Sequence, residues 1–213
     1  MSNSSLKIIA CLTMLMDHIG ATLYPDMSLL RMIGRLSFPI FAFLVVEGFH
    51  HTQNIKKYGI RLGVFALISE VPYDLAFRGN IIDFYRQNIF FTLFLGLVCL
   101  WFYHRYRSQR PMIAMFAVLL IGSLSVLLKT DYSIYGIVMI LLFDYFRDRR
   151  IFACVSTGAI NFTMGSAIQG LAIFAMPLIL LYNGEKGINL KYLFYGFYPV
   201  HLTILYVLQK VWR

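Results

Sequence analysis

Long apolar runs separated by short polar breaks occupy most of this chain. Each run is close to the roughly 20 residues with which a helix crosses a bilayer core, and none shows the alternation typical of strands. The runs form nine segments, of which the sixth, seventh and eighth are short: residues 6–24, 27–49, 58–77, 87–104, 111–128, 132–146, 151–165, 167–182 and 192–211. The pattern predicts an all-α fold, a polytopic transmembrane helix bundle of about nine spans.

One stretch leaves the number of spans open. The residues "NFTMGSAIQG" (161–170) fit either a tight turn between two short spans or a break within one irregular pair. Eight or ten spans are therefore the alternatives to nine. No linker is long enough to define a second domain, so residues 1–213 are predicted to form a single domain.

Composition supports the membrane interpretation. Of the 213 residues, 59% are hydrophobic and 14% charged, whereas about 25% of residues are charged in an ordinary soluble domain. The mean hydropathy is +0.69. The start "MSNSSLK" leads into the first apolar run without a small-residue cleavage site, so no cleaved signal peptide is expected.

The net charge of +9 follows the ends of the apolar runs. Basic residues in such places set topology, so a nucleic-acid partner is not expected. With a cytoplasmic N-terminus, most lysines and arginines fall on the inner side, including the runs "HRYRSQR" and "RDRR". We therefore expect an integral protein of the cytoplasmic membrane, with its C-terminus outside if there are nine spans.

Ionisable residues lie inside the apolar runs, where each costs roughly 2.5 to 3.5 kcal/mol on insertion scales. The first run, "CLTMLMDHIGATLY", contains two of them side by side. A turn at "YPD" (24–26) folds the second span back to the same depth, and spans three and four add further polar residues there. We expect one cavity between the first four spans to collect Asp17, His18, Arg35, Glu70, Asp74 and Asn88.

Neighbouring residues on a helix point about 100° apart, so Asp17 and His18 cannot form an internal dyad. Asp17 is expected to pair with Arg35 or with Arg31, which lies one helical turn before Arg35 in the second span. His18 would then be a neutral imidazole whose second nitrogen needs an acceptor, either Glu70 or Asp74.

Prolines are expected to bend three spans, and one of them, Pro72, lies near Glu70 in span three. Pro39 cannot donate to the carbonyl of Arg35, which predicts a kink in span two at that level. Pro199 lies two residues before His201, a second histidine within an apolar run, and is expected to bend the last span. His201 is interpreted as either structural or catalytic.

A second polar set lies at the inner ends of the second and third spans. Three residues share one helix face and three basic residues follow them: Glu47, His50, His51, Lys56, Lys57 and Arg61. They fit either a solvated helix end or a cytosolic anion site. Adjacent histidines diverge on a helix, and no third ligand is evident, so no metal is expected. Three cysteines within apolar runs, without CxxC spacing, indicate neither a disulfide framework nor a zinc site.

Several blocks of the chain resemble the TraX family, relatives of the F-pilin N-acetyltransferase of conjugation systems. They are "MLMDHIG", "IGRLSFPIFAFLVVEGFHHT", "KYGIRLGVFALISEVPYDLAF", "QNIFFTLFLGL", "GEKG" and "KYLFYGFYPVHL". The first span also resembles, more distantly, the histidine-dependent transmembrane acyltransferases. The resemblance implies transfer of an acetyl group from acetyl-CoA to an amine or hydroxyl acceptor at the membrane, which is a pilin N-terminus in the founding member.

In such a reaction His18 is the natural general base, because its unperturbed pKa of about 6.5 leaves it mostly neutral at pH 7. Arg35 or Asn88 would donate to the developing oxyanion. The phosphates of coenzyme A would lie at a basic inner surface such as "HTQNIKKYGIR" or "RDRR".

Two other classes fit the same residues. A proton-coupled small-molecule transporter could use Asp17, His18, Glu70 and Asp74 as a relay, although the small size and the lack of an inverted repeat argue against it. The third class is an assembly factor without catalysis. Acetyl-CoA binding would distinguish the enzyme from both.

Overall fold

All regular elements are helices in the computed structural model, which describes residues 1–164, 167–189 and 191–212. In that part of the chain there is no strand, only an isolated bridge between Gln87 and Thr130. The helices are α1 (Asn3–Thr22), α2 (Ser28–Gly34), α3 (Ser37–His51), α4 (Ile55–Arg78), α5 (Ile89–Tyr106), α6 (Pro111–Leu127), α7 (Ser133–Tyr145), α8 (Arg150–Met164), α9 (Ala167–Gly170), the 3-10 helix η1 (Leu171–Phe174), α10 (Ala175–Leu180) and α11 (Lys191–Trp212). The predicted all-α class is confirmed.

The second predicted span is interrupted between α2 and α3. There the backbone N–H groups of Arg35 and Leu36 donate to carbonyls three residues earlier, as in a tight final turn. Pro39 lies in the first turn of α3. The N–H groups of a first turn make no hydrogen bond within the helix, so the lack of an N–H on proline costs nothing there. The kink predicted at the level of Arg35 is confirmed, and it takes the form of a helix break.

The eighth predicted span is also irregular. Residues 167–180 form the short helix α9, the 3-10 helix η1 and the short helix α10 in succession. The ambiguous stretch 161–170 begins inside α8 and ends in α9, but residues 165–166 within it lie outside the described residues. By contrast, Pro72 and Pro199 lie inside the continuous helices α4 and α11.

Three helical stretches in the described residues are long and apolar enough to cross a membrane: α1, the combined stretch Ser28–His51, and α5. Three further apolar helices are shorter, and α4 carries charged residues from one end to the other. The count of nine spans therefore stays a prediction.

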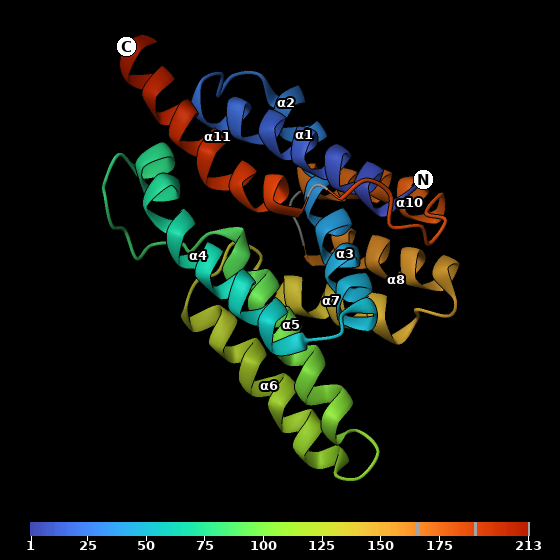
Figure 1. Ribbon diagram of the computed structural model, residues 1–213. Coiled ribbons are helices and arrows are strands. Elements are labelled where there is room, and N and C mark those ends of the chain that lie inside the picture. Colours follow the sequence, from blue (N-terminus) through green and yellow to red (C-terminus); the bar gives the residue numbers. More distant parts are fainter. Residues whose placement is uncertain (165–166, 190, 213) are drawn as a thin grey trace.

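Helices α1, α4 and α11 run in the same direction. At one end, Gln209 of α11 donates to the carbonyl oxygens of Thr22 and Ala76, which lie near the ends of α1 and α4 (both 3.1 Å). At the other end, the backbone N–H of Ile188, just before α11, donates to the Ser4 hydroxyl of α1 (3.1 Å). Figure 1 shows α1 and α11 side by side. Residues from opposite ends of the sequence therefore meet along two neighbouring helices.

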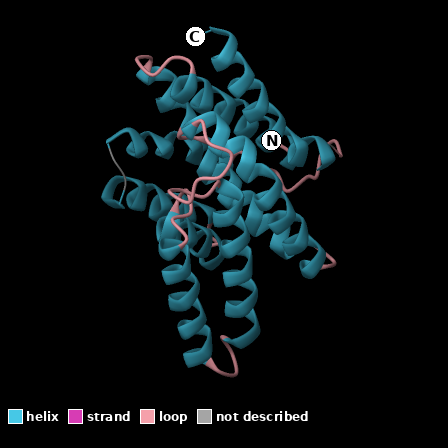
Figure 2. Ribbon diagram, turned by 90° about the vertical axis from the view of Figure 1, so that its left-hand side faces the viewer, coloured by secondary structure: helices cyan, strands magenta, loops and turns pink. Residues whose placement is uncertain are grey.

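Helices α5 and α6 form a hairpin that projects from the rest of the bundle in both views (Figures 1 and 2). The main hydrophobic core takes residues from most of the other helices and from α5, and it includes Leu6 of α1, Phe38 and Val46 of α3, Leu97 of α5 and Met139 of α7. Packing around this core fixes the relative positions of the polar residues described next.

Candidate functional site

Two buried histidines from opposite ends of the chain form a direct hydrogen bond. Nδ1 of His18 on α1 lies 2.7 Å from Nε2 of His201 on α11. Their rings are stacked with an interplanar angle of 12°, and the side chains of Phe77 and Tyr198 pack edge-on against His18. Only 8% of His18 and 5% of His201 are exposed.

The contacts of the pair indicate where its protons lie. Nδ1 of His201 is 2.7 Å from the backbone oxygen of Phe197, which can only accept, so this nitrogen carries a proton. In a neutral ring, Nε2 of His201 is then the acceptor, and Nδ1–H of His18 donates to it. This leaves a lone pair on Nε2 of His18, which has no hydrogen-bond partner among the described residues. The tautomer that results is the one a general base requires.

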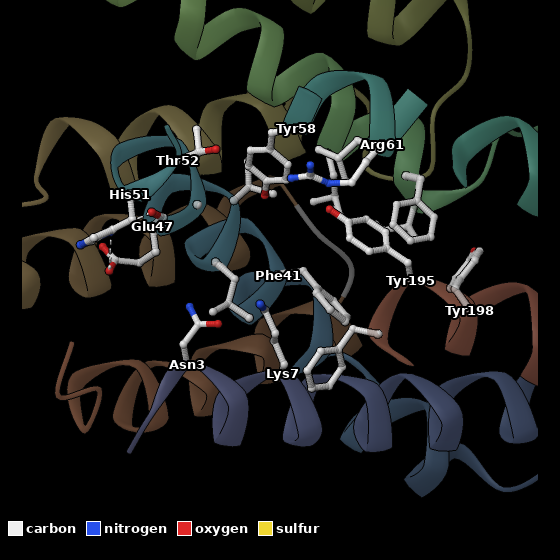
Figure 3. Close-up of a pocket in the computed structure, with 18 of the residues that line it drawn as sticks. Asn3, Lys7, Phe41, Glu47, His51, Thr52, Tyr58, Arg61, Tyr195 and Tyr198 are labelled. Atoms are coloured by element: carbon white, nitrogen blue, oxygen red, sulfur yellow. Dashed lines mark hydrogen bonds and ion pairs between the residues drawn. The ribbon is translucent and has the colours of Figure 1, made fainter. Parts of the chain in front are cut away.

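A cavity of about 500 Å³ leads toward this histidine pair. It is lined by residues of α1, α3, α4, α5 and α11, among them Met14. Phe41 and Tyr198 also line it (Figure 3). Met14 lies four residues before His18, on the same face of α1, and Tyr198 contacts the rings of both histidines. His18 therefore lies about one helical turn beyond the end of the cavity.

The other end of the cavity is basic. Lys7 of α1, Arg61 of α4 and Lys186 of the segment before α11 line it. Figure 3 shows Lys7 directed from α1 into the space between the helices, and the Arg61 guanidinium extending toward Tyr58. Nε of Arg61 is buried without a hydrogen-bond partner in the described part of the chain, so this guanidinium keeps an unsatisfied donor. About 16 Å of helix separates Lys7 from His18, at 1.5 Å per residue.

Three of the residues predicted to bind the cofactor line this cavity: Glu47, His51 and Arg61. The Nδ1–H of His51 donates to the backbone oxygen of Glu47 (2.9 Å). Sequence reasoning did not include Lys7 and Lys186 in the site. The one feature of the sequence that could have indicated these two lysines is their position at the predicted inner ends of apolar runs.

Four predicted cofactor-binding residues lie outside the cavity lining: His50, Lys56, Lys57 and Asn88. His50 points away from His51 and contacts Asp144 of α7. Lys56 and Lys57 are exposed at the start of α4. Asn88 is the N-cap of α5, and its side-chain amide donates to the Ala66 oxygen (2.8 Å) and to Glu70.

Asp17 forms the predicted ion pair with the second span. Its carboxylate oxygens lie 2.8 Å from an Nη of Arg31 and 2.6 Å from an Nη of Arg35, so it pairs with both arginines. Arg35 also contacts the side chain of Gln169 on α9 (3.4 Å). The prediction that Asp17 and His18 have partners on different helices is confirmed.

The structure does not bring the six predicted residues into one cavity. Asp17 and Arg35 form one group, His18 pairs with His201, and Glu70 pairs with Asn88. The acceptor predicted for His18 was wrong, because Glu70 faces the start of α5 and Asp74 accepts from the backbone N–H of Asp83 (2.7 Å). The hydrogen-bond partner of His18 is instead His201 of α11, a helix that packs against both α1 and α4.

His201 is the functional candidate whose partner the sequence did not identify. Its signal was a histidine close to Pro199 within the last apolar run. The role of Asn88 as an oxyanion donor also loses support, because its N–H groups already have acceptors in α4.

Comparison with known proteins assigns the chain a set of relatives. A family model described as "TraX protein" matches residues 2–209. The chain is 30% identical over 235 aligned positions to the probable fimbrial assembly protein FimC, serogroup H1, of Dichelobacter nodosus, covering 94% of this chain and 92% of that protein. It is 26% identical over 218 positions to protein TraX of Escherichia coli K12, covering 95% and 85%.

A shorter match, 29% identical over 98 positions, is to the uncharacterized protein RP591 of Rickettsia prowazekii, covering 46% of this chain and 36% of that protein. No solved structure matches.

Proposed function

The chain belongs to the TraX family, and from this premise we propose that it is an integral membrane acetyltransferase that uses acetyl-CoA. The observation that carries the proposal is the His18–His201 pair, with an unprotonated Nε2 on His18, about one helical turn beyond one end of a cavity whose other end is basic. General bases in acyl transfer must lie within reach of the acceptor proton and be unprotonated at neutral pH.

The proposed reaction is a single acyl transfer. The nitrogen or oxygen of the acceptor attacks the thioester carbonyl and its proton passes to Nε2 of His18. The C–S bond then breaks, and the proton neutralises the departing coenzyme A thiolate. His201 holds the His18 ring by accepting from Nδ1–H, and this acceptor stabilises the imidazolium that forms during the attack.

The basic end of the cavity is the proposed site of the coenzyme A phosphates. Arg61, Lys7 and Lys186 lie there, and charge-assisted hydrogen bonds from arginine and lysine are the usual means of holding phosphate. The pantetheine arm would extend along α1 toward Tyr198. Because acetyl-CoA is a cytosolic metabolite, this end would face the cytoplasm, in a polytopic protein of the cytoplasmic membrane with its N-terminus inside.

The acceptor is proposed from the relatives. One of them is a probable fimbrial assembly protein, and the resemblance noted in the sequence implies a pilin N-terminus in the founding member. We propose an amine or hydroxyl presented at the membrane, with the N-terminus of a pilin-type subunit as the first to test.

The test is transfer of a radiolabelled acetyl group from acetyl-CoA by purified protein in membranes that contain candidate acceptors. His18→Ala should reduce transfer at least about 100-fold, because a general base contributes 10²- to 10⁴-fold. Leu12→Ala changes an exposed residue on the same helix and should retain activity. A His18→Ala protein that folds and transfers acetyl at the wild-type rate would remove His18 from the mechanism.

The transporter alternative requires a proton relay formed by one histidine and three acidic residues: Asp17, His18, Glu70 and Asp74. In the structure Asp17, His18 and Glu70 belong to three separate hydrogen-bonded groups. Solute flux driven by a pH gradient in liposomes, without acetyl-CoA binding, would favour the transporter instead.

A further inference from the structure

Two histidines and an aspartate meet at the carboxyl ends of α3, α5 and α7. Nε2 of His50 on α3 lies 2.7 Å from Oδ1 of Asp144 on α7, and Nε2 of His104 on α5 lies 2.7 Å from Oδ2 of the same carboxylate. The three donor atoms all lie within 4.8 Å of one another. This group is separate from the cavity and from the His18–His201 pair.

The carboxylate of Asp144 needs a positive partner. Its side chain is only 2% exposed, and burial of a carboxylate without compensating charge is strongly unfavourable. In the described part of the chain its ion-pairing contacts are the two imidazoles alone. Arg147, one turn further along the chain, instead approaches Glu47 (3.9 Å).

The donor set suits a divalent transition metal. Zn²⁺ binds imidazole nitrogen and carboxylate oxygen at about 2.0 to 2.2 Å, which places tetrahedral ligand atoms roughly 3.3 Å apart. Tetrahedral binding would require the two 2.7 Å nitrogen–oxygen contacts to open by about 0.6 Å, and the widest separation in the group, at most 4.8 Å, to close to the same value. Both imidazoles are about one-fifth exposed, at 21% and 22%, so solvent can reach a fourth position.

The helix directions favour a cation at this place. His50 and Asp144 are each the penultimate residue of their helix, and His104 lies in the last turn of α5. The carboxyl ends of α3, α5 and α7 therefore converge on the group, and a helix carries partial negative charge at that end.

We propose that His50, His104 and Asp144 bind one divalent transition-metal ion of the zinc class, which cross-links the ends of α3, α5 and α7. This inference goes beyond the proposed acetyl transfer and does not depend on it. The sequence alone predicted no metal because His51 was the only candidate second ligand beside His50. The second and third ligands come from residues 54 and 94 positions further along the chain.

The test uses the full-length protein without a polyhistidine tag, stripped with a chelator and titrated with Zn²⁺ against a chromophoric competitor. The wild type should bind one equivalent. His104→Ala and Asp144→Asn should each weaken binding at least tenfold. His51→Ala is the matched control, since His51 is adjacent to His50 but faces away from the group, and it should bind like the wild type.

A second measurement covers variants that fold poorly. With Co²⁺ as the probe, His104→Cys should restore binding and add a thiolate-to-metal absorption band that the wild type lacks, because thiolate is itself a transition-metal ligand. The proposal is overturned if the wild type binds no stoichiometric Zn²⁺, or if binding survives both His104→Ala and Asp144→Asn. In either case the group would be a hydrogen-bonded histidine–aspartate cluster only.

Discussion

Asp17 and His18 are adjacent in the sequence but belong to different polar groups. The step of about 100° per residue directs Asp17 toward the arginines of the second span and His18 toward α11. Asp17 is therefore already neutralised and lies apart from the imidazole. One residue stabilises the packing of α1 against α2, while the other is available for chemistry.

His201 is expected to act through His18 rather than on substrate, because both of its ring nitrogens are already occupied, Nε2 by His18 and Nδ1 by the Phe197 oxygen. His201→Phe removes the acceptor for His18 Nδ1–H and should lower kcat for acetyl transfer at least about tenfold, with KM for acetyl-CoA unchanged. His201→Gln keeps a side-chain acceptor and should recover part of the activity. Wild-type kcat in a folded His201→Phe protein would contradict the positioning role.

The double ion pair of Asp17 predicts an order of stabilities. Asp17→Asn leaves two partly buried guanidinium groups without a counter-charge and should destabilise the fold by about 3 kcal/mol. Arg35→Ala should cost more than Arg31→Ala, since the Arg35 side chain is 18% exposed and that of Arg31 34%. Thermal unfolding in one detergent measures all three variants. Equal unfolding temperatures for the two arginine variants would contradict this order.

At the scale of elements, α2 approaches α1 closely enough that only glycine fits at one contact. A side chain built at Gly34 would overlap the side chain of Asp17. The break after Gly34 then starts α3 in a new direction, and Arg35 lies at this break beside Asp17. A short helix and a helix break thus bring both arginines to one carboxylate.

Gly34→Ala should destabilise the protein by about 1 to 3 kcal/mol, because α1 and α2 must move apart to admit the methyl group. The matched control is Gly196→Ala in α11, where an added methyl meets no atom within 4 Å. That change should be neutral or stabilising by up to about 1 kcal/mol, since alanine is the better helix former. Comparable losses of unfolding temperature in both variants would show that the close approach at Gly34 is not the cause.

For the whole molecule, the two ends of the bundle have different chemistry. The histidine pair and the Asp17 ion pairs lie toward the carboxyl end of α1, and the basic cavity mouth lies toward its start. Nucleotide binding and proton transfer would then occur at separate places joined by one cavity.

This division predicts a difference between basic residues on one helix. Arg61→Ala should raise KM for acetyl-CoA about tenfold, the loss expected for one charge-assisted hydrogen bond. Lys57→Ala, four residues earlier and outside the cavity lining, should leave KM unchanged. The measurement is initial rate against acetyl-CoA concentration at fixed ionic strength, since salt screens the exposed Lys57 more than the half-buried Arg61. Equal effects of both variants would locate the phosphates elsewhere.

The amino-acid sequence by itself determined the helices and the local relations within them. Seven of the nine predicted apolar segments each agree with one observed helix, whereas the second and the eighth are divided. The break beside Arg35 and the pairing of Arg35 with Asp17 follow from Pro39, the turn at 24–26 and the helical repeat. These features depend on residues close together in the chain, whose geometry the backbone fixes.

The tertiary structure alone decided which polar residues meet. His18 and His201 are 183 positions apart, and the His50–His104–Asp144 group joins three helices. Glu70 and Asn88, expected beside His18, pair with each other instead. Helical periodicity gives the face on which a side chain lies, but the helix that covers this face is chosen by packing of the whole bundle.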